Sequence, residues 1–259
     1  MSVELVENDC LNIIENGKIS DVDLSFLDPP FNQDKEYPTH NDSMDSQDYW
    51  SWMKEVCSAI YDLTVEGGAI YFMQREKNAE FVLRTLRKTG WKFQNLIIWR
   101  KTTSAVPSNI RYGKKYQIIA FGTKGDKPRV FNKLRHYPPL PTNYKREREK
   151  GIYLTDVWTD IRELTSGYFA GDEPLRDEEG NRVHKQQSPV ELLARIILVS
   201  SKPGDLILDP FGGTGTTGVV ARQLNRNCVL IEKDAYYADV IRDRLEEERE
   251  ADDDRNRSS

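Results

Sequence analysis

The 259-residue chain has few of the residues that build metal centres or disulfide frameworks. Its three cysteines, Cys10, Cys57 and Cys228, are odd in number and far apart, and it has only three histidines. None of these residues shows the spacing of metal ligands, so we expect no metal site and no disulfide framework. Free cysteines of this kind are typical of a reducing cytoplasm.

Long hydrophobic runs are also missing. No apolar stretch approaches the roughly 20 residues that cross a membrane, and residues 1–5 lack the basic and apolar regions of a signal peptide. A hydrophobic content of 38% and a mean hydropathy of -0.67 indicate a soluble protein with a polar surface. We therefore expect a cytoplasmic protein with no membrane partner. Its length suits one large α/β domain or two small ones.

Charge is unevenly distributed along the chain. The net charge is -5, yet residues 84–150 hold 18 lysines and arginines against three acidic residues, a surplus of 15. The remaining residues therefore carry a net charge of -20. Salt-bridged helix faces mix their signs, whereas a surplus of one sign in one segment indicates a polyanionic partner that touches that region.

The first motif is Asp28-Pro29-Pro30-Phe31, which follows an alternating apolar run at residues 22–27. That run predicts a strand entering the core. The two prolines remove two backbone donors and fix two φ angles, so the strand must end in a stiff turn. Open α/β sheets bind ligands at the carboxyl ends of their strands. The four residues therefore fit a site for a planar amine, although they fit a simple strand-ending turn equally well.

The rest of the chain predicts an alternation of strands and helices. We expect strands at 3–9, 69–73, 91–99, 116–121, 205–209 and 228–232, and helices at about 49–64, 81–86, 188–199, 216–224 and 236–246. Ser188, Pro189 and Glu191 resemble a capping box at the start of one helix. Residues 124–186 show no sustained periodicity, and residues 247–259 form a charged tail that we expect to be disordered.

The second motif lies in the glycine-rich turn after the strand at 205–209. Gly213, Gly215 and Gly218 have the G-x-G-x-x-G spacing of a dinucleotide-binding turn, and Glu232 ends the next strand. An NAD-dependent dehydrogenase is thus one interpretation. Asp209 argues against it, because a carboxylate at the strand tip would repel a pyrophosphate. The sulfonium and ammonium groups of S-adenosylmethionine would instead be attracted. A non-catalytic DNA-binding module is a third interpretation, but it has no use for Asp28 or Asp209.

Together the two motifs resemble those of the amino-group DNA methyltransferases, which use S-adenosylmethionine. The Asp-Pro-Pro-Phe motif comes first, a variable region follows, and Asp209-Pro210-Phe211-Gly212-Gly213-Thr214-Gly215 comes last, which is the order of the β class. The resemblance extends from about Val3 to Leu245. It implies a doubly wound, Rossmann-like α/β fold with a seven-stranded mixed sheet and a loop-rich recognition insertion.

The same resemblance implies a division of the chain and a set of site residues. Residues 1–123 would form the catalytic half, 124–186 the target-recognition insertion, and 187–246 the cofactor-binding half. The catalytic residues would be Asp28, Pro29, Pro30 and Phe31. The expected contacts with S-adenosylmethionine are Asp9, Cys10, Gln187, Pro189, Asp209, Phe211, Gly213, Gly215, Thr216 and Glu232. Lys185, Gln186 and Ser188 depart from the family pattern in the stretch before the helix.

The implied reaction is methyl transfer to the exocyclic amine of a flipped-out base. Phe31 would stack on the base, while the Asp28 carboxylate and the Pro29 carbonyl would accept the two amine hydrogens. Adenine N6 is favoured over cytosine N4, because aspartate at this position is commoner in the adenine subgroup. Double-stranded DNA would be the partner, and its phosphates would contact Arg111, Lys114, Lys115, Lys145, Arg146 and Arg148. The resemblance also admits a cognate restriction endonuclease, a homodimer, and a prokaryotic or phage origin.

Overall fold

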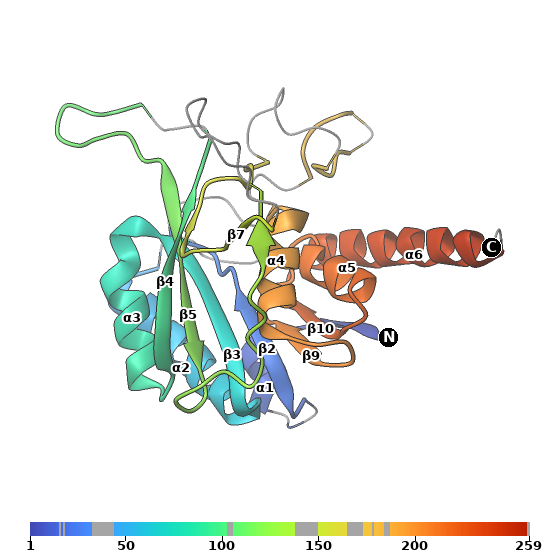
Figure 1. Cartoon of the computed structure of the whole chain (residues 1–259), viewed down its shortest axis with the longest axis horizontal. Helices are drawn as coiled ribbons and strands as arrows, with labels where there is room; N and C mark the ends of the chain where they lie inside the picture. The colour runs from blue at the N-terminus through green and yellow to red at the C-terminus, as the bar shows by residue number, and fades with distance from the viewer. Residues whose placement is uncertain are drawn as a thin grey trace.

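A mixed eight-stranded sheet forms the centre of the molecule (Figure 1). The computed structural model describes residues 1–15, 17, 19–32, 44–102, 106–137, 150–164, 173–177, 179–183 and 187–257. Within these residues the sheet has the order β1-β10-β9-β2-β3-β5-β4-β8. The strands are β1 (Val3–Glu7), β2 (Val22–Leu27), β3 (Thr64–Arg75), β4 (Lys92–Arg100), β5 (Tyr116–Thr123), β8 (Val157–Trp158), β9 (Leu206–Asp209) and β10 (Asn227–Glu232).

Only β5 runs against the other described strands of this sheet: it is antiparallel to both β3 and β4, while the remaining pairs are parallel. β2 and β9 are neighbours, and the chain leaves them in opposite directions, from β2 towards β3 and from β9 towards β10. This reversal is the topological switch point at which doubly wound sheets bind ligands. The short strands β6 (Arg135–His136) and β7 (Ile152–Tyr153) pair separately.

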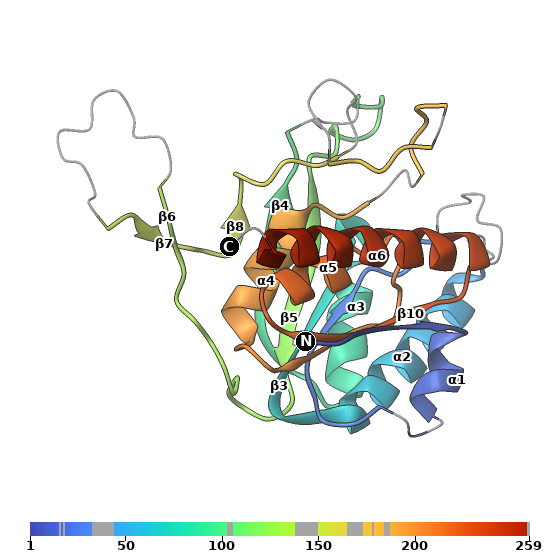
Figure 2. The same ribbon diagram turned by 90° about the vertical axis from the view of Figure 1, so that its right-hand side faces the viewer.

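Helices cover both faces of the sheet (Figures 1 and 2). One face carries α1 (Cys10–Glu15), α2 (Ser46–Leu63) and α3 (Ala79–Lys88), which follows the 3-10 turn η1 (Glu76–Asn78); the other carries α4 (Val190–Ser200), α5 (Thr216–Gln223) and α6 (Ala235–Arg257). Two hydrophobic clusters lie between the layers, one on each side of the sheet. The expected doubly wound α/β fold is confirmed. None of the described helices is both long and apolar enough to cross a membrane.

The sheet has eight strands and not the seven that we expected. The additional strand is β8, which lies inside the segment that showed no periodicity and pairs with β4. Two residues are too few to produce an alternating pattern, so periodicity does not predict this strand. It is held by side chains. Trp158 is buried, and the guanidinium of Arg195 lies 5.1 Å from the centre of its ring and makes two hydrogen bonds to Asp160, of 3.0 and 2.7 Å.

The structure also differs from our expectation at the carboxyl end. We expected a disordered tail from residue 247, but α6 continues to Arg257. Glutamate, arginine and alanine, which make up much of residues 246–251, are strong helix formers, and a charged surface can be tolerated by a helix that lies in solvent. Charge alone therefore did not predict the end of the helix. Figure 1 shows this end of α6 extending past the sheet.

The contact between Asp160 and Arg195 offers a test of how β8 is held. Arg195 is 8% exposed, so removing Asp160 leaves a buried cation with only its longer contact of 3.3 Å to the more exposed Glu191. We expect Asp160→Ala to lower the free energy of unfolding by about 2 kcal/mol, less than a fully buried pair would lose because Asp160 is itself partly exposed. Chemical denaturation monitored by tryptophan fluorescence would measure this.

Asp156→Ala is the matched control, because Asp156 is an exposed aspartate of the same segment and forms no ion pair with any residue that the structure describes. It should change stability by less than about 0.5 kcal/mol. The pKa of Asp160 is lowered chiefly by its hydrogen bond to Arg195. Its stabilising effect should therefore be present above the ordinary aspartate pKa and disappear as the pH falls through the lowered value. Equal stability of the two variants would contradict this account.

Candidate active site

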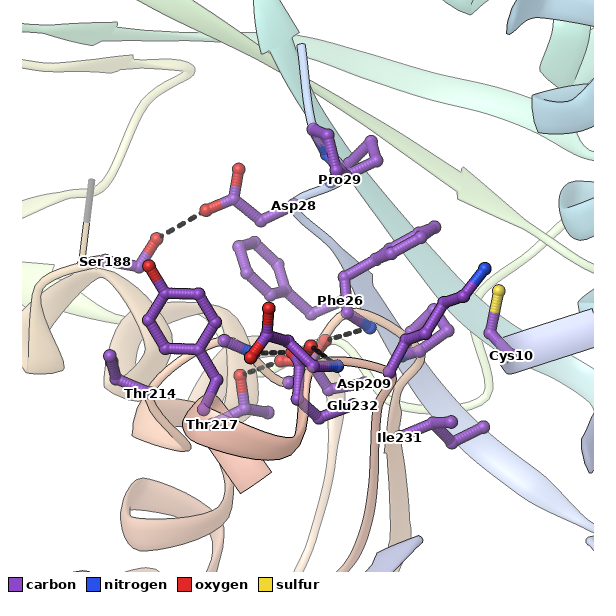
Figure 3. A pocket seen from close by; sticks show the side chains of 18 of the residues that line it. Cys10, Phe26, Asp28, Pro29, Ser188, Asp209, Thr214, Thr217, Ile231 and Glu232 are labelled. Carbon is purple, nitrogen blue, oxygen red and sulfur yellow. Dashed lines mark hydrogen bonds between the residues drawn. The ribbon is translucent and has the colours of Figure 1, made fainter. Parts of the chain in front are cut away.

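A cavity of about 500 Å³ lies at the carboxyl ends of β1, β2, β9 and β10, beside the topological switch point (Figure 3). Both sequence motifs contribute to its wall. Its lining includes predicted residues from each part of the chain: Asp9, Cys10, Asp28, Pro29, Pro30, Gln187, Asp209, Phe211, Gly213, Thr216 and Glu232. Cavities of this size suit small-molecule ligands. The fold therefore joins the two motifs, about 180 residues apart in sequence, into one site.

Side chains of α2 and β3 hold the turn that follows Asp28. The hydroxyl of Tyr49 donates a hydrogen bond of 2.8 Å to the Pro30 carbonyl, and the amide of Gln74 donates one of 3.0 Å to that hydroxyl. Tyr49 and Gln74 are both buried. A proline-rich turn without its own backbone donors is thus fixed by side chains of the neighbouring elements. Such support keeps the Asp28 carboxylate at the cavity wall.

Ser188 contacts Asp28 directly. Its hydroxyl donates a hydrogen bond of 2.9 Å to Oδ2 of the carboxylate (Figure 3). The predicted capping box is therefore wrong: α4 begins at Val190, and Ser188 makes no capping bond to it. The carboxylate of Glu173 replaces the serine, because it accepts a hydrogen bond of 2.6 Å from the Val190 N–H. Sequence reasoning missed this arrangement because Glu173 lies in the aperiodic segment.

Gln187 connects residues 173–175, near the end of the aperiodic segment, to the cavity. Its side-chain amide donates to the Glu173 carbonyl at 3.1 Å and accepts from the Leu175 N–H at 3.0 Å. The residue is buried and also lines the cavity. Residues 173–175 are therefore fastened beside Asp28 by two adjacent residues, Gln187 and Ser188. These contacts link the predicted recognition segment to the Asp28-Pro29-Pro30-Phe31 motif.

Asp209 ends β9 and is almost completely buried. Its carboxylate accepts a hydrogen bond of 2.5 Å from the Thr217 hydroxyl and one of 3.0 Å from the Phe211 N–H. Burial, with a smaller contribution from nearby Glu232, raises the pKa of this carboxyl to about 6 against the lowering effect of both hydrogen bonds. An uncompensated carboxylate in this position would favour a cationic ligand.

The glycine-rich turn lets the backbone approach the cavity and α6. Gly215 precedes α5 with φ 76°, and a Cβ there would come within 3.1 Å of Ile241. The N–H of Gly213 donates a hydrogen bond of 2.7 Å to Glu232, whose other oxygen accepts from the Asp234 N–H at 2.9 Å. Burial raises the pKa of Glu232. The acidic residue thus lies at the tip of β10, facing the turn.

These contacts decide between the two cofactor interpretations. A pyrophosphate binds through the free N–H groups of a glycine-rich turn. Here the N–H groups of Phe211 and Gly213 already donate to carboxylates. Asp9, Asp28, Asp209, Glu232 and Asp234 all line the cavity, so its wall is strongly acidic. The wall fits the sulfonium and ammonium groups of S-adenosylmethionine and does not fit a dinucleotide.

Three predicted site residues do not line the cavity: Phe31, Pro189 and Gly215. Phe31 is 4% exposed, so its ring is packed in the protein. Of the predicted DNA contacts, Arg111 and Lys115 are on the exposed connection after β4, and Lys114 forms an ion pair of 2.9 Å with Glu76. Lys145, Arg146 and Arg148 lie outside the described residues.

Other lining residues were missed by sequence reasoning: Phe26, Met44, Trp52, Ser188, Thr217, Lys233, Asp234 and Tyr237. Trp52 is the clearest example. It lies on α2, and its ring makes an edge contact with Phe211 at 5.7 Å at the cavity. Periodicity separates buried residues from exposed ones, and it does not separate a core from a ligand cavity.

Comparison with known proteins gives an independent result. The DNA methylase family model, for N6 and N4 methyltransferases, matches residues 22–243. Type II methyltransferase M.HinfI of Haemophilus influenzae is 29% identical over 94% of this chain and 68% of its own length. The DNA adenine methyltransferase YhdJ of Escherichia coli K12 is 29% identical over 90% of this chain and 79% of its own length.

The fold has solved counterparts. The structure of the cytosine-N4-specific PvuII DNA methyltransferase aligns with a TM-score of 0.68 at 17% identity, over 93% of this chain and 85% of that one. This likeness concerns the fold. The family match includes both motifs and the segment between them. Residues of both motifs line the same cavity. The chain belongs to the amino-group DNA methyltransferase family.

Proposed function

We propose that this chain transfers a methyl group from S-adenosylmethionine to adenine N6 of a flipped-out base at a specific DNA sequence. The observation that carries the proposal is the single cavity that contains Asp28 at one part of its wall and Asp209 with Glu232 at another. Family membership supports amino-group methylation of DNA by S-adenosylmethionine. The choice of adenine depends on the aspartate of the Asp28 motif and on the similarity to an adenine methyltransferase.

In this proposal the acidic wall holds the cofactor. Asp209 would attract its ammonium group, Glu232 would accept from its ribose hydroxyls, and Phe211 would pack against it. Trp52 supports Phe211 from the side. When bound, S-adenosylmethionine supplies the methyl group on its sulfonium. The chain requires no metal for this chemistry, since the leaving group is a neutral thioether.

The Asp28 turn would hold the target amine. Its carboxylate and the Pro29 carbonyl accept the two N–H hydrogens, which directs the nitrogen lone pair towards the methyl carbon. One oxygen of Asp28 also accepts from Ser188, and a carboxylate has capacity for several donors. The new N–C bond forms as the C–S bond breaks, and the amine then loses a proton. Stacking of Phe31 on the base would require its buried ring to turn outwards.

The remaining parts of the proposal concern DNA. A base inside a duplex cannot reach the cavity, so the target nucleotide must be flipped out. Residues 124–186 would read the sequence, and Arg111 and Lys115, together with the Lys145, Arg146 and Arg148 group, would contact phosphates. A partner restriction endonuclease and a homodimer belong to the same proposal. The acidic cavity and the basic segment would thus bind cofactor and DNA, respectively.

Expression in a methylation-free bacterial host, followed by genome-wide detection of modified bases, tests the function. We expect N6-methyladenine at one sequence motif. Detection of N4-methylcytosine would change the proposed target base from adenine to cytosine and leave the rest of the proposed function unchanged. Genomes that stay unmodified, with folded protein that binds the methyl donor in the same cells, would reject DNA methylation. Purified protein should also be stabilised against heat by S-adenosylmethionine and unaffected by NAD.

Substitution of Asp28 separates chemistry from cofactor binding. We expect Asp28→Ala to lower methyl transfer by about 100-fold or more, because the amine loses its acceptor and its alignment. Cofactor affinity, measured by calorimetry, should stay nearly unchanged, since Asp209 and Glu232 remain. Turnover close to that of the natural chain would remove the role given to this carboxylate.

Substitution of Ser188, which donates a hydrogen bond to Asp28, provides a second test with a smaller expected effect. Ser188→Ala removes one hydrogen bond to a charged group and should lower turnover by about tenfold. Ser188→Thr keeps the hydroxyl and should restore most of the activity. If alanine and threonine gave the same loss, the effect would come from the local packing and not from the hydroxyl.

The raised pKa of Asp209 predicts a pH dependence of cofactor binding. A cationic ligand binds the ionised carboxylate, so affinity should rise as the pH increases through about 6. Below that value each unit of pH should weaken binding by up to about tenfold. Folding stability should move the other way, because between the ordinary aspartate pKa and the raised one only the folded chain keeps this proton.

Calorimetric titration with S-adenosylmethionine between about pH 5 and pH 8 would measure this dependence. Asp209→Asn should bind weakly and with a flatter profile, retaining only the contribution of Glu232, whose pKa burial also raises. An affinity of the natural chain that stays constant across the range would contradict the electrostatic role of Asp209.

A further inference from the structure

The connection between β4 and β5 carries the three most exposed large hydrophobic side chains among the described residues. Val106, Ile110 and Tyr112 are 90%, 91% and 96% exposed. We name residues 106–115, the described part of this connection after residue 102, the β4–β5 loop. Apolar side chains scattered singly on a surface need no explanation, but three within seven residues indicate a contact surface.

The loop has a defined shape at its tip. The Ser108 N–H donates a hydrogen bond of 3.1 Å to the Arg111 carbonyl, which closes a turn over Asn109 and Ile110. At the base of the loop, the Lys101 N–H donates to the Lys115 carbonyl at 2.8 Å. The ion pair between Lys114 and Glu76 attaches the same base to the body of the protein. A tethered base and a closed turn make this loop a projecting arm.

The arm leaves the sheet at the edge that contains the cavity. β4 is parallel to β2, because β2 is parallel to β3, and both β3 and β4 are antiparallel to β5. The carboxyl end of β4 therefore lies at the same edge as Asp28, and both figures show the arm projecting beyond that end of the strand. From Lys101 to the turn, an extended chain reaches at most about 25–30 Å, which exceeds the depth of either DNA groove.

The chemistry of the arm favours DNA over a protein partner. Residues 101–115 contain Lys101, Arg111, Lys114 and Lys115 and no acidic residue. Basic side chains beside an exposed apolar tip match a polyanion with a hydrophobic interior, which describes a base-paired duplex. DNA-bending proteins insert apolar side chains between base steps, and this insertion helps to offset the free-energy cost of unstacking the bases.

We propose that the tip of the β4–β5 loop is a wedge, and that Ile110 and Tyr112 enter the duplex beside the target and occupy the space that the flipped base leaves. The inference rests on the proposed function, since the wedge fills a space that exists only when the target base is flipped out. Arg111, between them in sequence, and Lys115 contact the flanking phosphates. The cavity and the wedge thus act on the same extruded nucleotide, because Asp28 holds the base outside the helix while the tip keeps the helix from closing.

The test compares methylation of two short duplexes that contain the sequence found by the genome-wide experiment. In one the target base is correctly paired, and in the other it faces a mismatched base. A mispaired base leaves the stack more easily, so it depends less on a wedge. The double variant Ile110→Ala/Tyr112→Ala should lose about tenfold or more on the paired duplex and stay within about threefold of the natural chain on the mismatched one.

Phe93→Ala is the matched control, because Phe93 is a 49% exposed aromatic residue at the other end of β4. It should leave both duplexes unaffected. The double variant should also keep the salt dependence of DNA binding, whereas Arg111→Ala/Lys115→Ala should reduce it by up to about two phosphate contacts.

Three results would overturn the wedge. Full activity of the double variant on the paired duplex would show that the tip is not needed. An equal loss on both duplexes would assign the tip to general DNA binding. A change of oligomeric state on substitution would assign it to self-association. If the natural chain methylated neither duplex nor any genome, the proposed function would fail, and the wedge with it; an active natural chain with an unaffected variant removes the wedge alone.

Discussion

The parallel pairing of β2 with β9 is the contact on which the site depends. Leu24 faces Ile207 and Ser25 faces Leu208, which places the ends of the two strands side by side. The Leu206 N–H donates to Asp23 at 2.8 Å, and Arg129 bridges Asp23 and Asp205. Without this pairing, Asp28 and Asp209 would belong to two separate half-sites. With it, they face one cavity at the switch point of the sheet.

That arrangement has an energetic cost. Burial raises the pKa values of Asp209 and Glu232, so their ionised forms destabilise the folded chain near neutral pH. Thr217, Gly213 and the Phe211 N–H offset part of that cost through hydrogen bonds. Such conflicts between local stability and charge are expected at functional sites. A cationic cofactor would relieve the conflict, so binding and folding should support each other.

Much of this site could be predicted from the sequence, for a physical reason. Residues that end parallel strands share one edge, so two strand-ending motifs place their own residues near each other without any long-range information. Asp28, Asp209 and Glu232 were found in this way.

Ser188, Glu173 and Trp52 were not found, because their positions depend on side-chain contacts between distant segments. The capping box failed for the same reason: the Ser188 hydroxyl pairs with Asp28, which the fold brings beside it from a distant part of the chain. β8 was missed because its two residues, Val157 and Trp158, are held by pairing with β4 and by the contact of Trp158 with Arg195, and not by any local pattern.

The charge pattern of the chain also follows from the chemistry. An acidic cavity attracts a cationic cofactor but repels DNA phosphates, so a duplex cannot approach the cavity wall closely. In the proposed reaction a flipped base solves this conflict, because the neutral base of one nucleotide can enter the cavity while the phosphates of the duplex stay outside it. The proposed reaction would thus use both the surplus of positive charge in residues 84–150 and the negative charge elsewhere. A protein of uniform charge could bind the cofactor or the DNA well, but the proposed reaction requires both in contact at Asp28.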